Sequence, residues 1–274
     1  MKEGFQTSIM IIKEYANYKK ESLKSEIAKL NPIPHFVIIQ VNEDEGSNAY
    51  VKGKIKDATE VGIICDLVKL PVTVSQDELL AKIDEINKDD NIDGLIVQMP
   101  LPKQIDEEVV KLAVDPRKDI DGFHPLAKMD PCTPKGIINY LKDEKYELSG
   151  KNAVVIGRSN IVGKPMGRLL LAENCNVTTV HSRTSKEDMK FYIEHADIIV
   201  IAIGKAGFLD HSYNYKPDCI IVDVGINRID GKLHGDAERD LPVRFQTPVP
   251  GGVGLLTRLT LLTNLMQAYY ERRK

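Results

Sequence analysis

The chain has 274 residues, enough for about two domains at about 150 residues each. Apolar residues make up 42% and charged residues 28%, a composition that excludes a disordered chain and is ordinary for a globular enzyme. Lys and Arg number 37 against 40 Asp and Glu, and the net charge of −3 argues against a nucleic-acid binder or a binder of anionic membranes. An anionic ligand therefore requires a local site.

The first part of the chain alternates between helical and apolar extended segments. An amphipathic helix is expected over residues 5–30, where the breakers Asn31-Pro32 and Ile33-Pro34 follow. The next expected elements, in order, are strand His35–Val41, helix 47–61, strand Ile64–Leu70, helix 75–88, strand Ile92–Met99 and helix 106–114. Near-continuous apolar strands at this spacing predict a parallel sheet that is covered on both faces.

The second part repeats this alternation after a connection rich in Pro, Asp and Gly, Asp115–Pro134. The expected helices are Thr133–Leu141, 164–173, 185–195 and a last one from Gly254 to Tyr270, and the expected strands are Ala153–Ile156, Val177–Val180, Ile198–Ile203 and Cys219–Val224. Residues 225–250 are polar and rich in turn residues. We expect two α/β domains with a cleft between them, and ligands at the carboxyl ends of the strands.

Cysteine usage and hydropathy bear on location. Four cysteines lie far apart without a CxxC pair, which favours reduced thiols in a cytosolic protein over a disulfide or a metal site: Cys65, Cys132, Cys175 and Cys219. Cys132, in Pro131-Cys-Thr-Pro134, is either a packed thiol or a site residue. The N-terminus lacks the long apolar region of a signal peptide, and the longest apolar run, Ile198–Ile203, is too short for a membrane span. We expect a soluble, cytoplasmic protein.

A glycine turn follows the strand Ala153–Ile156. Gly157-Arg-Ser-Asn-Ile-Val-Gly163 is similar to a Rossmann turn, whose amides and helix N-terminus receive a pyrophosphate; a plain turn is an equal reading of these residues alone. The next strand ends in His181-Ser-Arg183 without the carboxylate that NAD-preferring folds place there. Arg158, Ser182 and Arg183 instead favour the 2′-phosphate of NADP, although a surface arginine pair remains an alternative.

Polar residues also mark the first domain. Tyr50 and Lys54 are four residues apart on one face of the expected helix 47–61. Gln98 ends a strand, and Asp121 lies in the connection within Lys118–Phe123. In isolation these residues are typical of a packing tyrosine, a solvated lysine, a strand-end amide and an Asp-Gly turn.

Taken together and in order, these strings resemble the bifunctional methylenetetrahydrofolate dehydrogenase/cyclohydrolase family. The resemblance runs from about residue 40 to the last helix. It is carried by Tyr50–Lys54, Gln98–Pro102, Lys118–Phe123, Pro131–Pro134, Gly157–Gly163, His181–Thr184 and Thr247–Gly254.

The resemblance implies roles for the catalytic residues. Lys54 matches the acid/base lysine, and Gln98 the residue that holds and tunes it. Tyr50 matches the tyrosine that stacks on the aminobenzoate ring, and Asp121 the aspartate that hydrogen-bonds the pterin. The remaining implied substrate residues are Pro100, Leu101, Pro250, Gly251 and Gly252. The implied NADP residues are Gly157, Arg158, Ser159, Val162, Gly163, His181, Ser182, Arg183, Gly204 and Ile226.

The implied activity is NADP-dependent oxidation of 5,10-methylenetetrahydrofolate, followed by hydrolysis of the methenyl product to 10-formyltetrahydrofolate. Hydride removal mainly needs orientation of donor and acceptor, whereas hydrolysis needs a proton shuttle that a neutral lysine can provide. The resemblance also implies a cytoplasmic homodimer that serves one-carbon metabolism and purine biosynthesis. Its implied domains are residues 1–120 with 256–274, which bind folate, and residues 121–255, a Rossmann-type NADP-binding domain with a linker over 115–134.

Two departures from the family pattern leave alternatives open. The loop over residues 126–130 is shorter than usual, and Leu255 stands where the family has proline. The sequence therefore leaves open whether the chain retains both activities. An enzyme that uses NAD, or one with the dehydrogenase activity alone, stays an alternative within the family. Two alternatives lie outside the family. One is a folate- or nucleotide-binding module without turnover, and the other is a Rossmann dehydrogenase that acts on shikimate or amino acids.

Overall fold

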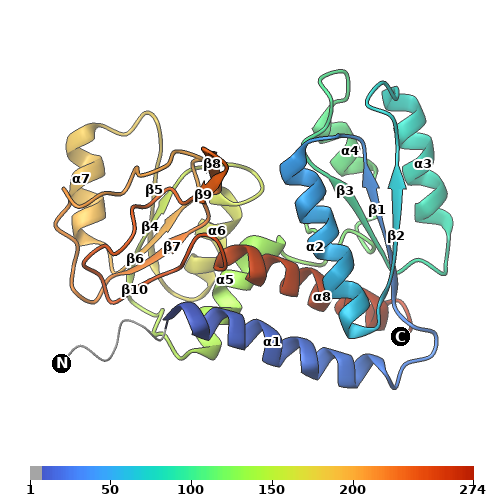
Figure 1. Cartoon of the computed structure of the whole chain (residues 1–274), viewed down its shortest axis with the longest axis horizontal. Coiled ribbons are helices and arrows are strands. Elements are labelled where there is room, and N and C mark those ends of the chain that lie inside the picture. Colours follow the sequence, from blue (N-terminus) through green and yellow to red (C-terminus); the bar gives the residue numbers. More distant parts are fainter. Residues whose placement is uncertain (1–7) are drawn as a thin grey trace. The chain divides into compact units, whose positions relative to one another are not determined.

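The structure is a computed structural model that describes residues 8–274 (Figure 1). The expected helix start at residue 5 and residues 1–7 of the N-terminal segment compared with a signal peptide lie outside the described residues. The chain divides into two compact units. The three-stranded unit comprises Tyr18–Cys132 and Arg258–Lys274, and the five-stranded unit comprises the residues up to Asn17 and Thr133–Thr257.

This division differs from the predicted one, which began the second domain at residue 121. The segment from Asp121 to Cys132 stays with the three-stranded unit because the Asn264 side chain donates hydrogen bonds to the carbonyl oxygens of Ile120 and Asp130. The first half of helix α1, Ser8–Ile27, belongs to the five-stranded unit because Ile12 packs in that unit's core.

The three-stranded unit contains a parallel sheet in the order β2-β1-β3. The strands are β1 (His35–Gln40), β2 (Ile64–Lys69) and β3 (Gly94–Gln98), and the helices are α2 (Glu45–Val61), α3 (Gln76–Lys88) and α4 (Glu107–Ala113). Gln40 pairs with Gln98 in the register of β1 and β3, so both side chains leave the same face at the carboxyl edge of the sheet.

The two faces of this sheet have different neighbours. On one face, Val37 and Val97 pack in a cluster with Leu79 and Ile83 of α3 and Val110 of α4. Residues that alternate with them, among them Gln98, face the opposite side, where α2 supplies Lys54 as a hydrogen-bond partner. The opposite face is also apolar along most of its length, with Phe36, Ile38 and Ile96 buried, and it becomes polar only at its carboxyl end, at Gln40 and Gln98.

The five-stranded unit contains a parallel sheet in the order β10-β7-β6-β4-β5. Its strands are β4 (Asn152–Ile156), β5 (Asn176–Val180), β6 (Ile198–Ile201), β7 (Ile220–Asp223) and β10 (Phe245–Gln246), and its helices are α5 (Cys132–Asp143), α6 (Gly163–Ala172) and α7 (Lys186–His195). Helix α8, Val253–Glu271, begins in this unit and continues in the other. The predicted fold of two α/β units with parallel sheets is confirmed.

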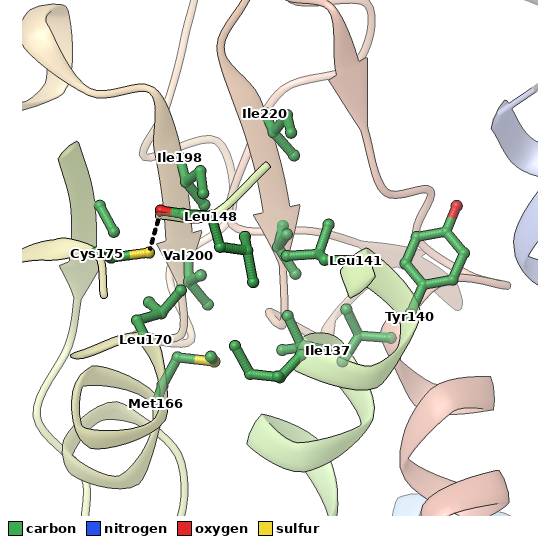
Figure 2. Close-up of a cluster of buried hydrophobic side chains, with 14 of the residues drawn as sticks. Ile137, Tyr140, Leu141, Leu148, Met166, Leu170, Cys175, Ile198, Val200 and Ile220 are labelled. Carbon is green, nitrogen blue, oxygen red and sulfur yellow. Dashed lines mark hydrogen bonds between the residues drawn. The ribbon is translucent and has the colours of Figure 1, made fainter. Parts of the chain in front are cut away.

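Alternate residues of these strands supply two cores. Figure 2 shows the first, where Ile198, Val200 and Ile220 meet Leu141 of α5 and Leu170 of α6. Their neighbours in sequence, such as Ile199 and Ile221, face the other side and pack with Ile193 of α7. This two-sided burial explains why β6 is apolar throughout its length and β4 from Ala153 to Ile156.

Residues 225–250, predicted as turns, contain three short strands. β8 (Asn227–Ile229) and β9 (Lys232–His234) form an antiparallel hairpin, and β10 joins the sheet. The hairpin turns at Asp230-Gly231, whose φ angles are 48° and 74°. Asp-Gly between two short strands is a strong signal for such a turn, so this hairpin was accessible to sequence reasoning. Across the described helices, none has the length and apolarity needed to cross a bilayer.

Adjacent leucines of α6 provide a test of the core assignment. Leu170 is fully buried, whereas Leu171 is 63% exposed. We expect Leu170→Ala to lower the free energy of unfolding by about 2–5 kcal/mol, because it removes buried methyl groups and leaves a cavity. Leu171→Ala should change it by less than about 0.5 kcal/mol. Urea unfolding of both variants measures the difference, and equal losses would contradict this placement of α6.

Candidate active site

Four predicted catalytic side chains meet at the carboxyl edge of the three-stranded sheet. Lys54 lies on the buried face of α2 and is only 4% exposed. Its Nζ donates a hydrogen bond to Gln98 Oε1 at 3.1 Å and lies 3.8 Å from Asp121 Oδ2. The same Nζ lies 5.3 Å from the centroid of the Tyr50 ring. The lysine is therefore a buried amine with a neutral acceptor, an anionic neighbour and an aromatic face around it.

Local structure places Lys54 and Gln98 opposite each other. Helix α2 begins where the Asp44 carboxylate accepts a hydrogen bond from the amide of Ser47, and it ends at Gly62, whose φ is 88°. Gln98 is the last residue of β3, and its Nε2 donates to the carbonyl of Met99 at 2.8 Å. Its Oε1 is thereby directed at the lysine.

The loop that carries Asp121 is fixed from several sides. The amide of Cys132 donates to the Asp121 carbonyl at 3.3 Å, and the Cys132 thiol donates to the Ile120 carbonyl at 3.2 Å. Gly122 has a φ of 75°, and a Cβ there would lie 2.6 Å from the carbonyl carbon of Asp130. Cys132, left open as a packed thiol or a site residue, is thus a buried thiol that supports the segment bearing Asp121.

Asp119 is a second carboxyl group in this loop. It is 5% exposed and accepts hydrogen bonds from the amides of Gly122 at 3.0 Å and His124 at 2.6 Å. Burial raises the pKa of Asp119 to about 6, and the charge of Asp121 acts in the same direction, while the amide hydrogen bonds oppose the shift. Asp119 is thus a buried carboxyl group held by main-chain amides, whereas Asp121, two residues later, lies beside the Lys54 amine.

Sequence reasoning missed a polar group on the same edge. Gln40 Nε2 donates to Asn48 Oδ1 at 2.7 Å, and Asn42 Nδ2 donates to the carbonyl of Pro100 at 2.8 Å. Gln40 Oε1 and Ser47 Oγ are buried and find no hydrogen-bond partner among residues 8–274. The available signals were the strand-end position of Gln40 and the place of Ser47 one helical turn before Tyr50. Of the other predicted substrate residues here, Pro100 is exposed and Leu101 half-buried.

The five-stranded unit carries the glycine turn between β4 and α6. Gly157 has a φ of 121°, and a Cβ at Gly163 would lie 2.5 Å from the Gly157 carbonyl oxygen, so both positions require glycine. Ser159 Oγ accepts hydrogen bonds from the amides of Val162 and Gly163 and so holds the turn that leads into α6. Within the described part of the chain, the amides of residues 158–161 donate no hydrogen bond. This cradle of open amides fits an anionic phosphate group.

The end of β5 lies next to β4 in the sheet and is free of carboxylates. His181 is half-buried and its Nδ1 accepts a hydrogen bond from the Arg183 amide at 3.2 Å. Ser182, Arg183 and Arg158 are exposed. A guanidinium and a hydroxyl at this position fit a further phosphate better than they fit a ribose hydroxyl pair.

The remaining predicted site residues of the five-stranded unit lie in three loops. Gly204 follows β6, Ile226 follows β7 and is 60% exposed, and Pro250–Gly252 follow β10. A cavity of about 1020 Å³, bordered by Lys232, His234 and Pro250 among others, adjoins the last of these loops. Among the residues that the structure describes, no group of three His, Cys, Asp or Glu side chains could hold a metal ion.

Comparison with known proteins gives consistent matches over both units. A family model described as the catalytic domain of tetrahydrofolate dehydrogenase/cyclohydrolase matches residues 10–121, and one described as its NAD(P)-binding domain matches residues 131–273. The bifunctional protein FolD of Halalkalibacterium halodurans is 43% identical over 275 residues, covering 94% of this chain and 97% of that protein.

Two solved structures of methylenetetrahydrofolate dehydrogenase/cyclohydrolases are also similar to this chain. The bifunctional FolD methylenetetrahydrofolate dehydrogenase/cyclohydrolase of Campylobacter jejuni has a TM-score of 0.90 at 36% identity, covering 95% of this chain and 98% of that chain. The methylenetetrahydrofolate dehydrogenase-cyclohydrolase of Trypanosoma brucei, complexed with NADP cofactor and inhibitor, has a TM-score of 0.90 at 29% identity, covering 95% and 96% of the two chains.

The raised pKa of Asp119 predicts a pH dependence of stability. The folded carboxyl group keeps its proton up to about pH 6, whereas the unfolded chain releases it near its ordinary pKa of about 3.9. The contribution of Asp119 to the free energy of unfolding is therefore largest below pH 4 and is lost as the pH rises through 6. Relative to Asp119→Asn, the wild type should lose on the order of 2 kcal/mol over this range. Denaturant unfolding at several pH values checks this, and parallel profiles would refute it.

Proposed function

The chain belongs to the tetrahydrofolate dehydrogenase/cyclohydrolase family, and from that premise we propose that it acts with NADP on 5,10-methylenetetrahydrofolate and with water on the methenyl product. The observation that carries the proposal is the buried Lys54 amine, held by Gln98 beside Asp121 and Tyr50. A binding module without turnover has no use for such an amine, since burying it is costly.

The dehydrogenase step relies on the five-stranded unit to hold the nucleotide. NADP, when bound, accepts a hydride from the methylene carbon of the substrate. The open amides of residues 158–161 would hold the pyrophosphate, and Arg158, Ser182 and Arg183 would bind the 2′-phosphate. The chain thus supplies position and charge, and the methenyl cation is stabilised by the two substrate nitrogens that flank it.

The cyclohydrolase step is assigned to Lys54. Water adds to the methenyl carbon, the bond from that carbon to N5 breaks, and N5 receives a proton, so that one proton is released overall. Lys54 would take the proton from the adding water and pass one to N5. Gln98 suits this task because its carbonyl orients the amine without adding a charge that holds it as ammonium.

Asp121 and Tyr50 are assigned to the substrate. A carboxylate accepts from the N–H groups of a pterin edge, and a half-buried tyrosine ring offers a face to the aminobenzoate ring. Asp121 Oδ2 lies 3.8 Å from Lys54 Nζ. Binding of the pterin to Asp121 would weaken the attraction between this carboxylate and the lysine.

Two structural departures bear on the alternatives, an NAD-dependent or dehydrogenase-only enzyme. The short loop turns where the Ala127 amide donates to the His124 carbonyl at 2.9 Å, and it exposes Leu126 by 72%. Leu255 packs against the core of the five-stranded unit. Neither contact involves Lys54, Gln98 or Asp121, which supports retention of both activities. We also propose, on the family resemblance alone, that the protein is cytoplasmic and forms a homodimer. Sedimentation velocity tests the dimer.

Substitutions at Lys54 and Asp121 should separate the two roles. Lys54→Ala should lower the rate of methenyltetrahydrofolate hydrolysis by about 10²–10⁴-fold, the usual contribution of an acid/base group, while NADP affinity stays unchanged. Asp121→Ala should raise the folate dissociation constant about tenfold or more in both reactions. Spectrophotometric assays that follow NADPH and the methenyl product separately measure both effects.

The matched control is Lys52→Ala, an exposed lysine on the same helix, which should leave both rates near those of the wild type. Hydrolysis by Lys54→Ala at the wild-type rate would remove the lysine from the mechanism. Unchanged folate affinity in Asp121→Ala would remove Asp121 from the substrate site.

The NADP assignment has its own test at Arg158. Removing the guanidinium should cost a charge-assisted contact to the 2′-phosphate, so Arg158→Ala should weaken NADP binding about tenfold or more and NAD binding much less. Isothermal titration with both nucleotides measures the ratio. An equal loss for the two nucleotides would place Arg158 away from the 2′-phosphate, and wild-type preference for NAD would support the alternative.

A further inference from the structure

The loops after β6, β7 and β10 extend beyond the sheet, so strand pairing does not hold them. They contain Gly204, Ile226 and Pro250–Gly252, which are assigned above to the nucleotide and the substrate. Gly204, Ile226 and Pro250 are all exposed. A precise binding surface on such loops needs support from behind. The structure supplies it with two buried carboxyl groups that sequence reasoning did not identify.

Asp236 binds the loop after β6. Its side chain is fully buried, and its Oδ2 accepts hydrogen bonds from the amides of Ile203 at 2.7 Å and Gly204 at 3.0 Å. Its Oδ1 accepts from the Lys205 amide at 2.7 Å and from Asn227 Nδ2 at 2.9 Å. Three consecutive amides thus converge on one carboxylate, which also reaches the loop after β7.

Asp223 connects Asp236 to the other loops. Asp223 Oδ1 accepts from the amides of Gly225 at 2.9 Å and Asp236 at 3.0 Å, and Oδ2 accepts from Ala237 at 2.9 Å. The amide of Asp223 donates to Thr247 Oγ1 at 2.8 Å, at the start of the segment that leads to Pro250. The pair therefore has a hydrogen bond to each of the three loops.

The two glycines beside the pair show how closely it is enclosed. A Cβ at Gly225 would lie 2.2 Å from Asp236 Cγ, and a Cβ at Gly235 would lie 1.9 Å from Asp223 Oδ2. A side chain at either position would displace a carboxylate from its amides. Backbone and carboxylates are packed as one unit, without room for a ligand to touch Asp236.

We propose that Asp236 is a positioning residue for the nucleotide site, whose carboxylate shapes the Ile203–Lys205 turn and, through Asn227 and Asp223, the neighbouring loops. The inference rests on the proposed function and on the family resemblance, which implies that Gly204 and Ile226 contact NADP. A carboxylate is suited to this role because it presents acceptors on both oxygens to four converging N–H donors. An amide side chain would turn a donor toward some of them.

The test is Asp236→Asn, with NADP affinity and methenyltetrahydrofolate hydrolysis measured on the full chain. The NADP dissociation constant should rise about tenfold or more, because hydrogen bonds to a charged group are lost. Hydrolysis at saturating folate uses no nucleotide, and its proposed acid/base group, Lys54, lies in the three-stranded unit, so its rate should stay within about twofold of the wild type. Amide hydrogen exchange without ligand should become faster over residues 203–205.

The matched control is Asp210→Asn in the same unit, where a carboxylate accepts from the Ser212 amide at 2.8 Å and, among the described residues, makes no hydrogen bond to Ile203–Lys205, Asn227 or Pro250–Gly252. This variant should bind NADP as the wild type does. If Asp236→Asn does not fold, Asn227→Ala removes one N–H from the same carboxylate and should still raise the NADP dissociation constant several-fold with hydrolysis retained.

Three results have distinct meanings. Wild-type NADP affinity in Asp236→Asn or Asn227→Ala would overturn the proposal, and so would a parallel loss of hydrolysis and NADP binding in a folded variant. Absence of NADP binding by the wild type would contradict the proposed function itself.

Discussion

The hydrogen bond from Lys54 to Gln98 is the interaction on which the rest of the site depends. Burying a lysine costs more than exposing it, and a neutral amide carbonyl compensates only in part. A carboxylate at the position of Gln98 would place a negative charge beside the amine. An uncharged amide at this position suits the proton transfer that we propose for Lys54. Helix α2 is capped by Asp44 and ends at Gly62. Helix α2 and strand β3 together place Lys54 Nζ 3.1 Å from Gln98 Oε1.

Asp121, the anionic neighbour of Lys54, lies in a loop of the three-stranded unit rather than in a helix or strand. Asp121 lies in a loop that is fixed by the Asn264 amide, by the amide of Cys132 and by the buried Asp119 carboxyl. Such support keeps Asp121 Oδ2 3.8 Å from Lys54 Nζ. In the proposed function, the carboxylate of Asp121 exchanges the lysine for the pterin as its partner, next to the uncharged amide of Gln98.

Much of the fold was predictable because its signals are local. Apolar strands and proline breakers placed the helices and strands outside residues 225–250, and family strings selected Lys54 and Gln98. The missed features depend on partners that are distant in sequence. Gln40 gains meaning only from its register opposite Gln98, and Asp236 only from the turn at Ile203–Lys205 that it binds. The unit boundary was displaced for the same reason, since Asn264 holds Ile120 across 144 positions. The Asp230-Gly231 hairpin is the exception, because its turn signal is local.

In the proposed function the two units bind anionic ligands by different physical means, which is compatible with a net charge of only −3. In the five-stranded unit the proposed phosphate site is made of main-chain amides, which carry no net charge, and the buried carboxylates are proposed to shape the loops beside it. In the three-stranded unit the proposed chemistry depends on one buried amine and one carboxylate. An excess of surface lysines would add little to either, because screening limits exposed charges to about 10 Å at ordinary ionic strength. Affinity built from oriented amides instead depends on loop geometry. The nucleotide site should therefore be more sensitive to its buried aspartates than to the overall charge of the chain.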